Sequence, residues 1–295
     1  MSGRRDARAD LCRGLALWMI VVNHTPGNAL GWLTLKNFSF SDATEAFVLL
    51  AGYAGAFAYA GAADRQGWPF AAAALVRRVG KLYVAHIFLL VVFTAQVGYS
   101  AAALDRAAYL DELALDPFGE NPYRTLLEAL LLRFQPAFLD ILPLYIALLS
   151  WLIPLLALRR RPWLLLALSV TVWAGGRAFG LNLPRWQGGG WFFNPLGWQL
   201  LFVLGFLLGQ AARGAATLPL PRPRPWLTAL VLAGLGAGCI LMLAATHAPE
   251  ALPDGLSAFL ATVDKTSLHP VRLLSVLAFT YLLVTMVPRD AAWVS

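Results

Sequence analysis

The chain has 295 residues, of which 59% are hydrophobic and only 13% are charged. Soluble domains carry about 25% charged residues, so this composition excludes an ordinary soluble protein and indicates one that lies in a bilayer. The net charge of +7 could point to nucleic acid, but the arginines are scattered between apolar runs rather than gathered in a patch. Cys12 and Cys239 both lie in apolar runs, and no spacing of Cys or His residues predicts a metal site.

The apolar runs predict the fold class. About eight of them are long enough to cross roughly 30 Å of hydrocarbon as helices. We therefore predict an all-α polytopic membrane helix bundle that forms one domain over residues 1–295. The predicted spans are residues 12–31, 43–62, 82–100, 137–157, 163–181, 191–211, 226–246 and 271–288.

The loops between these spans set an orientation. With the N-terminus in the cytoplasm, fifteen of the 23 Lys and Arg residues lie on the cytoplasmic side and eight lie opposite. The strongest contribution comes from the short turn LRRRP, residues 158–162. The positive-inside rule therefore predicts a multi-pass protein with a cytoplasmic N-terminus.

Two predicted outer loops are longer than a simple connection requires. Residues 101–136 include NPYRTLLEALLLRFQP, whose Leu and Phe spacing suits a short helix in the membrane interface. Residues 247–270 end in the polar run DKTSLHP. Each loop either helps to hold an extracytoplasmic substrate or is a solvated connector.

The first predicted helix carries two ionisable residues on nearly one face. Arg13 and His24 are eleven residues apart, which is three turns, so they lie roughly 16 Å apart along the axis. Pro26 predicts that the helix ends close to His24, with Asn28 nearby in the following loop. An imidazole there is either a general base or an interfacial side chain that Glu45 satisfies.

Two carboxylates open the second predicted helix. Asp42 suits an N-cap, with Ser41 as a rival, and Glu45 would then complete a capping box. The alternative is an imidazole–carboxylate pair in which Glu45 orients His24. Spacing alone leaves both interpretations open.

A basic cluster precedes the third predicted span. Arg77, Arg78 and Lys81 are either an anchor of the topology or a clamp for phosphate oxygens.

One further carboxylate, Asp140, is predicted near the outer end of the fourth span, where it needs a partner. Lys265, His269 or Arg272 could supply one from the other side of the bundle.

The segment WFFNPLGWQ, residues 191–199, combines aromatic and amide side chains. Trp191, Asn194, Trp198 and Gln199 could stack on a sugar and hydrogen-bond to it, or the tryptophans could belong to an interface belt. No phosphate-binding loop, nucleophile elbow or zinc-protease motif is present in the sequence.

Several of these segments resemble known families. RGLALWMIVVNH, EAFVLLAGY and RRVGKLY resemble the first three helical motifs of the membrane acyltransferase-3 superfamily. Within that superfamily the chain is most similar to the OpgC family, succinyltransferases of osmoregulated periplasmic glucans. The similar segments are NFSFSDATEAFVLLAGY, KLYVAH, FLDILPLY, FNPLGWQLLFVLGF and DKTSLHPVRLLSVLAFTYLL.

This resemblance implies an O-acyltransferase of the bacterial inner membrane. It implies acyl-CoA, as succinyl-CoA, for the co-substrate, no permanently bound cofactor, and a periplasmic glucan as acceptor. His24 would be the catalytic base, oriented by Glu45 or less readily by Asp42 or Asp140. The CoA phosphates would meet Arg13, Arg77, Arg78 and Lys81. For the acyl group and the glucan we expect contacts with Asn28, Trp191, Asn194, Gln199, Lys265 and Arg272.

The chain departs from the family pattern at three places. Ala51 stands where a serine usually precedes the glycine, and Lys81 stands where arginine is common. The sequence ends at VPRDAAWVS, whereas the family typically continues through about two more spans, so we expect either a short member or a fragment.

A different class of function also suits intramembrane ionisable residues. A non-enzymatic carrier or exporter of a polar or glycan substrate could use His24, Glu45 and Asp140 for proton coupling. Against this hypothesis, the sequence shows no evident inverted repeat, and its polar residues gather at helix ends.

Overall fold

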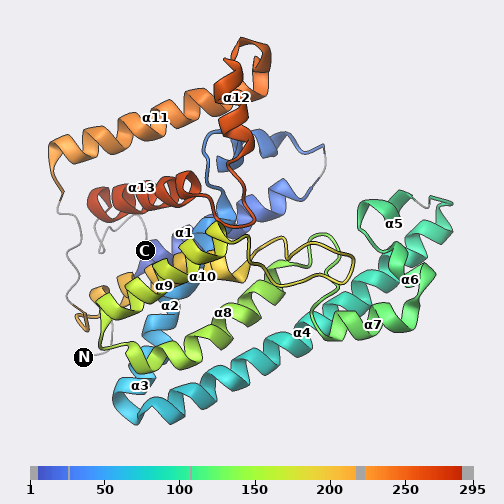
Figure 1. Ribbon diagram of the computed structural model, residues 1–295, viewed down its shortest axis with the longest axis horizontal. Coiled ribbons are helices and arrows are strands. Elements are labelled where there is room, and N and C mark those ends of the chain that lie inside the picture. Colours follow the sequence, from blue (N-terminus) through green and yellow to red (C-terminus); the bar gives the residue numbers. More distant parts are fainter. Residues whose placement is uncertain (1–5, 26, 107, 217–222, 288–295) are drawn as a thin grey trace. The chain divides into compact units, whose positions relative to one another are not determined.

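The computed structural model describes residues 6–25, 27–106, 108–216 and 223–287. They form helices and connecting loops (Figure 1). No β-strand occurs in these four segments, and Pro184 and Gly190 form only an isolated bridge. The prediction of an all-α fold is confirmed. The chain divides into two compact units, residues 1–57 with 201–295 and residues 58–200, which we describe in turn.

The first unit contains apolar helices from both ends of the chain, and it also holds residues 201–212 at the end of α10 (Pro195–Ala212). Its other elements are α1 (Ala7–Asn23), η1 (Ala29–Leu33), η2 (Leu35–Asn37), α2 (Ala43–Gly55), α11 (Pro225–His247), η5 (Pro249–Ala251), α12 (Asp254–Ala261) and α13 (Pro270–Met286).

The end of α1 agrees with the sequence prediction. The helix stops at Asn23 and His24 is its C-cap residue. Pro26, the basis of that prediction, lies outside the described residues. The helices α1 and α2 run antiparallel, because the Tyr53 hydroxyl near the end of α2 donates to Asp6 at the start of α1, at 2.9 Å. The end of α1 and the start of α2 therefore lie at the same end of the unit.

Glycines let α2 and α10 approach closely. A Cβ added to Gly52 would lie 1.9 Å from the carbonyl oxygen of Phe202, and one added to Gly205 would lie 1.9 Å from that of Leu49. No side chain fits at either position, so the two backbones touch there, as small residues allow between apolar helices.

The second unit is organised along one long helix. Its elements are α3 (Gly61–Gln66), α4 (Trp68–Ala103), α5 (Ala108–Glu112), α6 (Asp116–Glu120), α7 (Pro122–Leu130), α8 (Ile141–Leu155), η4 (Leu156–Leu158), α9 (Pro162–Ala178) and the first turns of α10. A π-helical turn, Ala56–Ala60, joins α2 to α3.

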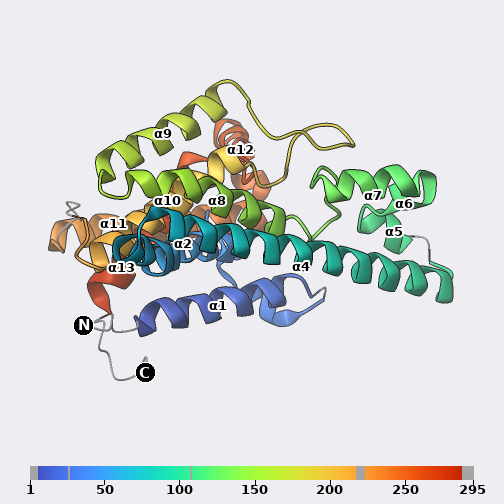
Figure 2. The ribbon, with the colours of Figure 1, turned by 90° about the horizontal axis from the view of Figure 1, so that it is seen from below.

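The helix α4 contacts both α8 and α7 along its length (Figure 2). It has 36 residues, about 54 Å, which exceeds the roughly 30 Å hydrocarbon core. Near its start, Trp68 Nε1 donates to the carbonyl of Ile153 in α8 at 3.0 Å. Further along, the Tyr83 hydroxyl donates to the carbonyl of Leu130 in α7 at 2.8 Å. The prediction of a span at residues 82–100 therefore found only the second half of this helix.

The apolar helices indicate that the chain is a membrane protein. Five stretches of the described residues are long and apolar enough to cross a bilayer, namely Ala43–Gln66, Trp68–Ala103, Ile141–Leu158, Pro195–Ala212 and Pro225–His247. The helix α13 is apolar but shorter. The predicted spans 12–31 and 163–181 correspond to α1 and α9, which have 17 residues each, so the count of about eight spans is not confirmed.

Candidate functional site

One face of α1 carries both Arg13 and His24. At 100° per residue this face also holds Leu17, Ile20 and Val21. We call these five residues the Arg13–His24 stripe. Leu17 is 46% exposed and Val21 is 66% exposed, and His24 is exposed as well. The stripe is therefore an open surface rather than a buried packing face.

The ring of His24 is held by the backbone of its own helix. Its Nδ1 lies 2.6 Å from the carbonyl oxygen of Ile20. A carbonyl oxygen only accepts hydrogen bonds, so we infer that Nδ1 carries the proton in the neutral ring. Nε2 then carries the lone pair, which is what a general base needs.

The start of α2 forms the predicted capping box. Asp42 Oδ1 accepts from the N–H of Thr44 at 2.7 Å, and Glu45 Oε2 accepts from the N–H of Asp42 at 2.9 Å. These bonds satisfy donors that the first turn of a helix leaves open. The capping interpretation of Asp42 and Glu45 is confirmed.

Two cations from a distant part of the chain pair with the carboxylates at the start of α2. Lys265 Nζ lies 2.6 Å from Asp42 Oδ2, and Arg272 Nη2 lies 2.6 Å from Glu45 Oε1. Arg272 Nη2 is also 3.6 Å from Asp42 Oδ2. We call Asp42, Glu45, Lys265 and Arg272 the four-charge cluster. Its two carboxylates and two cations balance, which lets Glu45 remain fully buried.

The electrostatics of this cluster fix the charge of Asp42. Burial alone would raise the pKa of Asp42, but the Lys265 ammonium and the hydrogen bond from the Thr44 N–H outweigh it. They hold the pKa of this carboxyl well below its usual value, so Asp42 is ionised at neutral pH.

These contacts change the partners that the sequence suggested. One oxygen of Glu45 binds Arg272 and the other binds the Asp42 N–H, so Glu45 faces partners other than His24. The carbonyl of Ile20 holds the imidazole instead. That Glu45 also orients His24 stays a prediction.

That Lys265, His269 or Arg272 supplies the partner of Asp140 stays a prediction. Lys265 and Arg272 bind Asp42 and Glu45 in the first unit. Asp140 precedes α8 in the second unit, half-buried, and does not cap that helix through its side chain.

A buried group of hydroxyls also lies in the first unit. The Ser275 oxygen lies 2.8 Å from that of Ser39 and 3.0 Å from that of Ser41. Sequence reasoning missed this group, because no local pattern joins positions more than 230 residues apart. The predicted Asn28 caps η1 through a bond from the N–H of Leu30, at 3.0 Å.

The residues expected to meet a sugar are buried in the second unit. Asn194 donates to the carbonyl of Leu181 at 2.7 Å and accepts from the N–H of Leu196 at 3.0 Å. Gln199 accepts from the hydroxyl of Ser169 at 2.6 Å and donates to its carbonyl. These amides bond to the protein itself and Trp191 is also buried, and their contact with a sugar stays a prediction.

The predicted phosphate ligands are accessible. Arg77, Arg78 and Lys81 are exposed on α4 in the second unit, and Arg13 is half-exposed on α1 in the first. That they form one clamp stays a prediction. Among the described residues, no group of three or more His, Cys, Asp or Glu could hold a metal ion.

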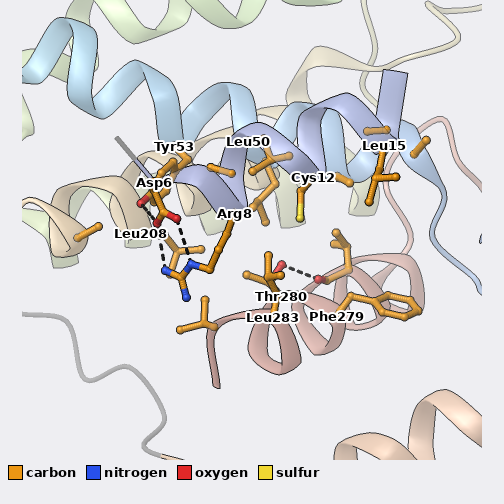
Figure 3. Close-up of a pocket in the computed structure, with 18 of the residues that line it drawn as sticks. Asp6, Arg8, Cys12, Leu15, Leu50, Tyr53, Leu208, Phe279, Thr280 and Leu283 are labelled. Atoms are coloured by element: carbon orange, nitrogen blue, oxygen red, sulfur yellow. Dashed lines mark hydrogen bonds and ion pairs between the residues drawn. The ribbon is translucent and has the colours of Figure 1, made fainter. Parts of the chain in front are cut away.

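A cavity of about 370 Å³ lies within the first unit, between α1, α2, α13 and the end of α10 (Figure 3). At 100° per residue its wall on α1 is centred about 110° away from the Arg13–His24 stripe. The residues of α1 that line it are Arg8, Ala9, Cys12, Leu15, Ala16 and Met19.

An ion pair forms one end of this cavity (Figure 3). Arg8 is only 6% exposed, and its Nε and Nη2 each lie 3.0 Å from an Asp6 carboxylate oxygen. Its Nη1 donates to the carbonyl of Val287 at 2.7 Å, and Tyr53 donates to Asp6. We call Asp6, Arg8 and Tyr53 the Arg8 cluster. Sequence reasoning missed it, although two opposite charges two residues apart beside an apolar run were a usable signal.

Comparison with known proteins identifies the family of the chain. The family model described as OpgC protein matches residues 5–295. The resemblance inferred from the motifs is thereby confirmed at the level of this family. No curated protein and no solved structure matches the chain.

Proposed function

Because the chain belongs to the OpgC family, we propose that it is a membrane O-acyltransferase that modifies a glucan. The donor is cytoplasmic acyl-CoA, and the family resemblance implies a succinyl group. The acceptor is a hydroxyl of a periplasmic glucan. The protein lies in the inner membrane with its N-terminus in the cytoplasm, in agreement with the distribution of its cations.

The observation that carries this proposal is the open stripe on α1. It puts a cation and a titratable imidazole on one accessible helix face, about 16 Å apart along the axis, with only apolar side chains between them. Such a face can guide a long donor arm from a phosphate site at one surface to a base near the other. The cation of this face that would meet the phosphates is Arg13.

The chemistry at His24 follows from its tautomer. Nε2 takes the proton from the glucan hydroxyl as the hydroxyl oxygen attacks the thioester carbonyl carbon. The new C–O bond forms, the C–S bond breaks, and the departing CoA sulfur takes the proton from Nε2. The carbonyl of Ile20 keeps the ring oriented and stabilises its protonated form through Nδ1–H.

The four-charge cluster has a supporting role in this proposal. Its cations join residues 265–272 to the start of α2, at the end of the unit where α1 presents His24. A succinyl carboxylate arriving there would meet Lys265 and Arg272, whose present partners are also carboxylates.

The proposal is tested with purified protein in proteoliposomes. Acyl-CoA is supplied on one side and glucan on the other, and succinylated glucan is measured by mass spectrometry. His24→Ala should abolish transfer, while the control His247→Ala should retain it. His247 is a matched control because it also ends a helix of the first unit, where its ring stacks on Trp32 at 5.9 Å.

The same vesicles separate an enzyme from a carrier. Transfer of the acyl group without net glucan flux supports the enzyme. Glucan flux in the absence of acyl-CoA contradicts it and supports a carrier.

A further inference from the structure

The cavity of the first unit has no part in the transfer proposed above. Its wall on α1 belongs to a different face from the Arg13–His24 stripe, and the charged residues in this wall are Asp6 and Arg8 of the Arg8 cluster. A space of this size is large enough to hold a ligand.

The polar groups in the cavity wall already have partners. Asp6, Arg8 and Tyr53 bind one another. The hydroxyl of Thr280 donates to the carbonyl of Val276 at 2.7 Å. Cys12 adds only a weakly polar thiol. All other lining residues are Ala, Leu, Met, Val or Phe.

The residues of the wall determine which kind of ligand the cavity can bind. A pantetheine arm carries amides and a hydroxyl, and each would lose its water without gaining a partner in this wall. A hydrocarbon chain has no hydrogen-bonding groups that need a partner. The cavity therefore suits an apolar occupant, and the acyl-CoA arm belongs on the other face of α1.

The dimensions of the cavity wall favour a ligand with a thin, extended shape. Its residues on α1 run from Arg8 to Met19, about 16 Å, and those on α13 run from Val276 to Val284, about 12 Å. The volume of about 370 Å³ is that of a small ligand pocket rather than a packing defect.

We propose that this cavity binds one acyl chain of a bilayer phospholipid. The chain lies lengthwise between α1, α2 and α13 and fills the space that their small and apolar side chains leave. Through it α1 is held against α13, which fixes the direction in which the Arg13–His24 stripe faces. A ligand that binds only the folded chain also stabilises the fold.

The test uses photo-crosslinking in vesicles of phosphatidylethanolamine and phosphatidylglycerol, a fraction of which carries a diazirine in one acyl chain. Labelled residues are identified by mass spectrometry. We expect labels on lining residues such as Cys12, Leu49 and Phe279, none of which is exposed. Labels on Leu17 and Val21, which are exposed, report only general contact with lipid.

A matched pair of variants makes the test specific. Ala46→Phe places a ring in the cavity, whereas Ala54→Phe places one on the same helix outside the cavity wall. Filling the space should lower labelling of the lining residues by about tenfold in the first variant and leave it unchanged in the second. Unchanged melting temperatures without lipid show that both variants are folded. If Ala46→Phe fails to fold, Leu283→Trp on the α13 wall replaces it.

Two results contradict the proposal. In the first, labels stay confined to exposed residues, or labelling of Cys12 and Leu49 is the same in Ala46→Phe as in the parent. In the second, succinyl-CoA displaces the lipid label from the lining residues, which would make the cavity the route of the acyl donor. Neither result bears on the base role of His24, which the transfer assay measures separately.

Discussion

The two faces of α1 differ in what their charged residues touch. On the Arg13–His24 stripe, the arginine and the histidine are accessible and lie among exposed apolar side chains. On the cavity face, Arg8 is buried and its guanidinium is bound to Asp6 and to a backbone carbonyl. The ionisable groups of the first face are accessible, whereas the charge of Arg8 on the second is bound within the protein.

This difference shows that the role of a basic residue in an apolar helix depends on what the residue contacts in the folded chain. Arg8 and Arg13 are five residues apart on one helix, and only their neighbours in the folded chain distinguish them. Variants on the two faces should therefore have different effects on activity and on stability.

Removal of the imidazole should have the largest effect on activity. His24→Ala should lower transfer by about 10²–10⁴-fold, the usual contribution of a positioned general base. Cys12→Ala, on the cavity face of the same helix, should leave the transfer rate within about twofold, since it removes no reacting group. Both rates are measured in the proteoliposome assay at equal protein level. Equal losses in the two variants would mean that they disturb the helix rather than the chemistry.

Removal of the buried carboxylate should act mainly on stability. Glu45→Gln leaves Arg272 without its closest partner, and breaking a buried ion pair from one side costs about 3–5 kcal/mol. The measurement is the free energy of unfolding in detergent. Because Ile20 holds the imidazole, transfer per folded molecule should persist. A fall of that specific activity to the level of His24→Ala would instead make Glu45 the group that orients His24.

The two arginines of α1 should affect different quantities. Arg13→Gln should raise the KM for acyl-CoA by about tenfold with little change in kcat, because a phosphate contact acts on binding. Arg8→Gln should leave that KM unchanged and lower the melting temperature, because Asp6 loses its ion pair with Arg8. If Arg8→Gln were the variant with the raised KM, the donor would enter along the cavity face.

The smallest effect concerns acid stability. The folded-state pKa of Asp42 is lowered by Lys265, so its pairing stabilises the fold at every pH above the unfolded pKa of about 3.9. That stabilisation is lost only as the pH falls further, through the lowered folded-state pKa. The free energy of unfolding, measured between pH 6 and pH 2, should decline more steeply in the parent than in Asp42→Asn. Identical slopes would show that the Asp42–Lys265 pair contributes no acid-sensitive stability.

Much of the architecture could be predicted from local pattern. Hydropathy predicted helices and a membrane setting, the residues near His24 predicted where α1 ends, and the spacing of Asp42 and Glu45 predicted a capping box. Each of these features depends on residues within a few positions of one another, which a sequence displays directly.

Features made by distant residues could not be predicted. Lys265 and Arg272 reach carboxylates more than 220 positions away, and periodicity assigns a residue to a helix face without naming the neighbour. The cavity has the same origin, since its walls come from four helices. The start of α4 was missed for another reason. Arg77, Arg78 and Lys81 interrupt an apolar run, but arginine and lysine are good helix formers and the helix continues through them.

We propose that this chain transfers an acyl group to a glucan with His24 as the base. The most direct measurement is the mass spectrum of periplasmic glucans from cells that lack the gene, complemented with the parent sequence or with His24→Ala at equal protein level. We predict succinylated glucan with the parent and none with His24→Ala. Equal succinylation in the two strains would contradict the role of His24, and its absence in both would contradict the proposed activity.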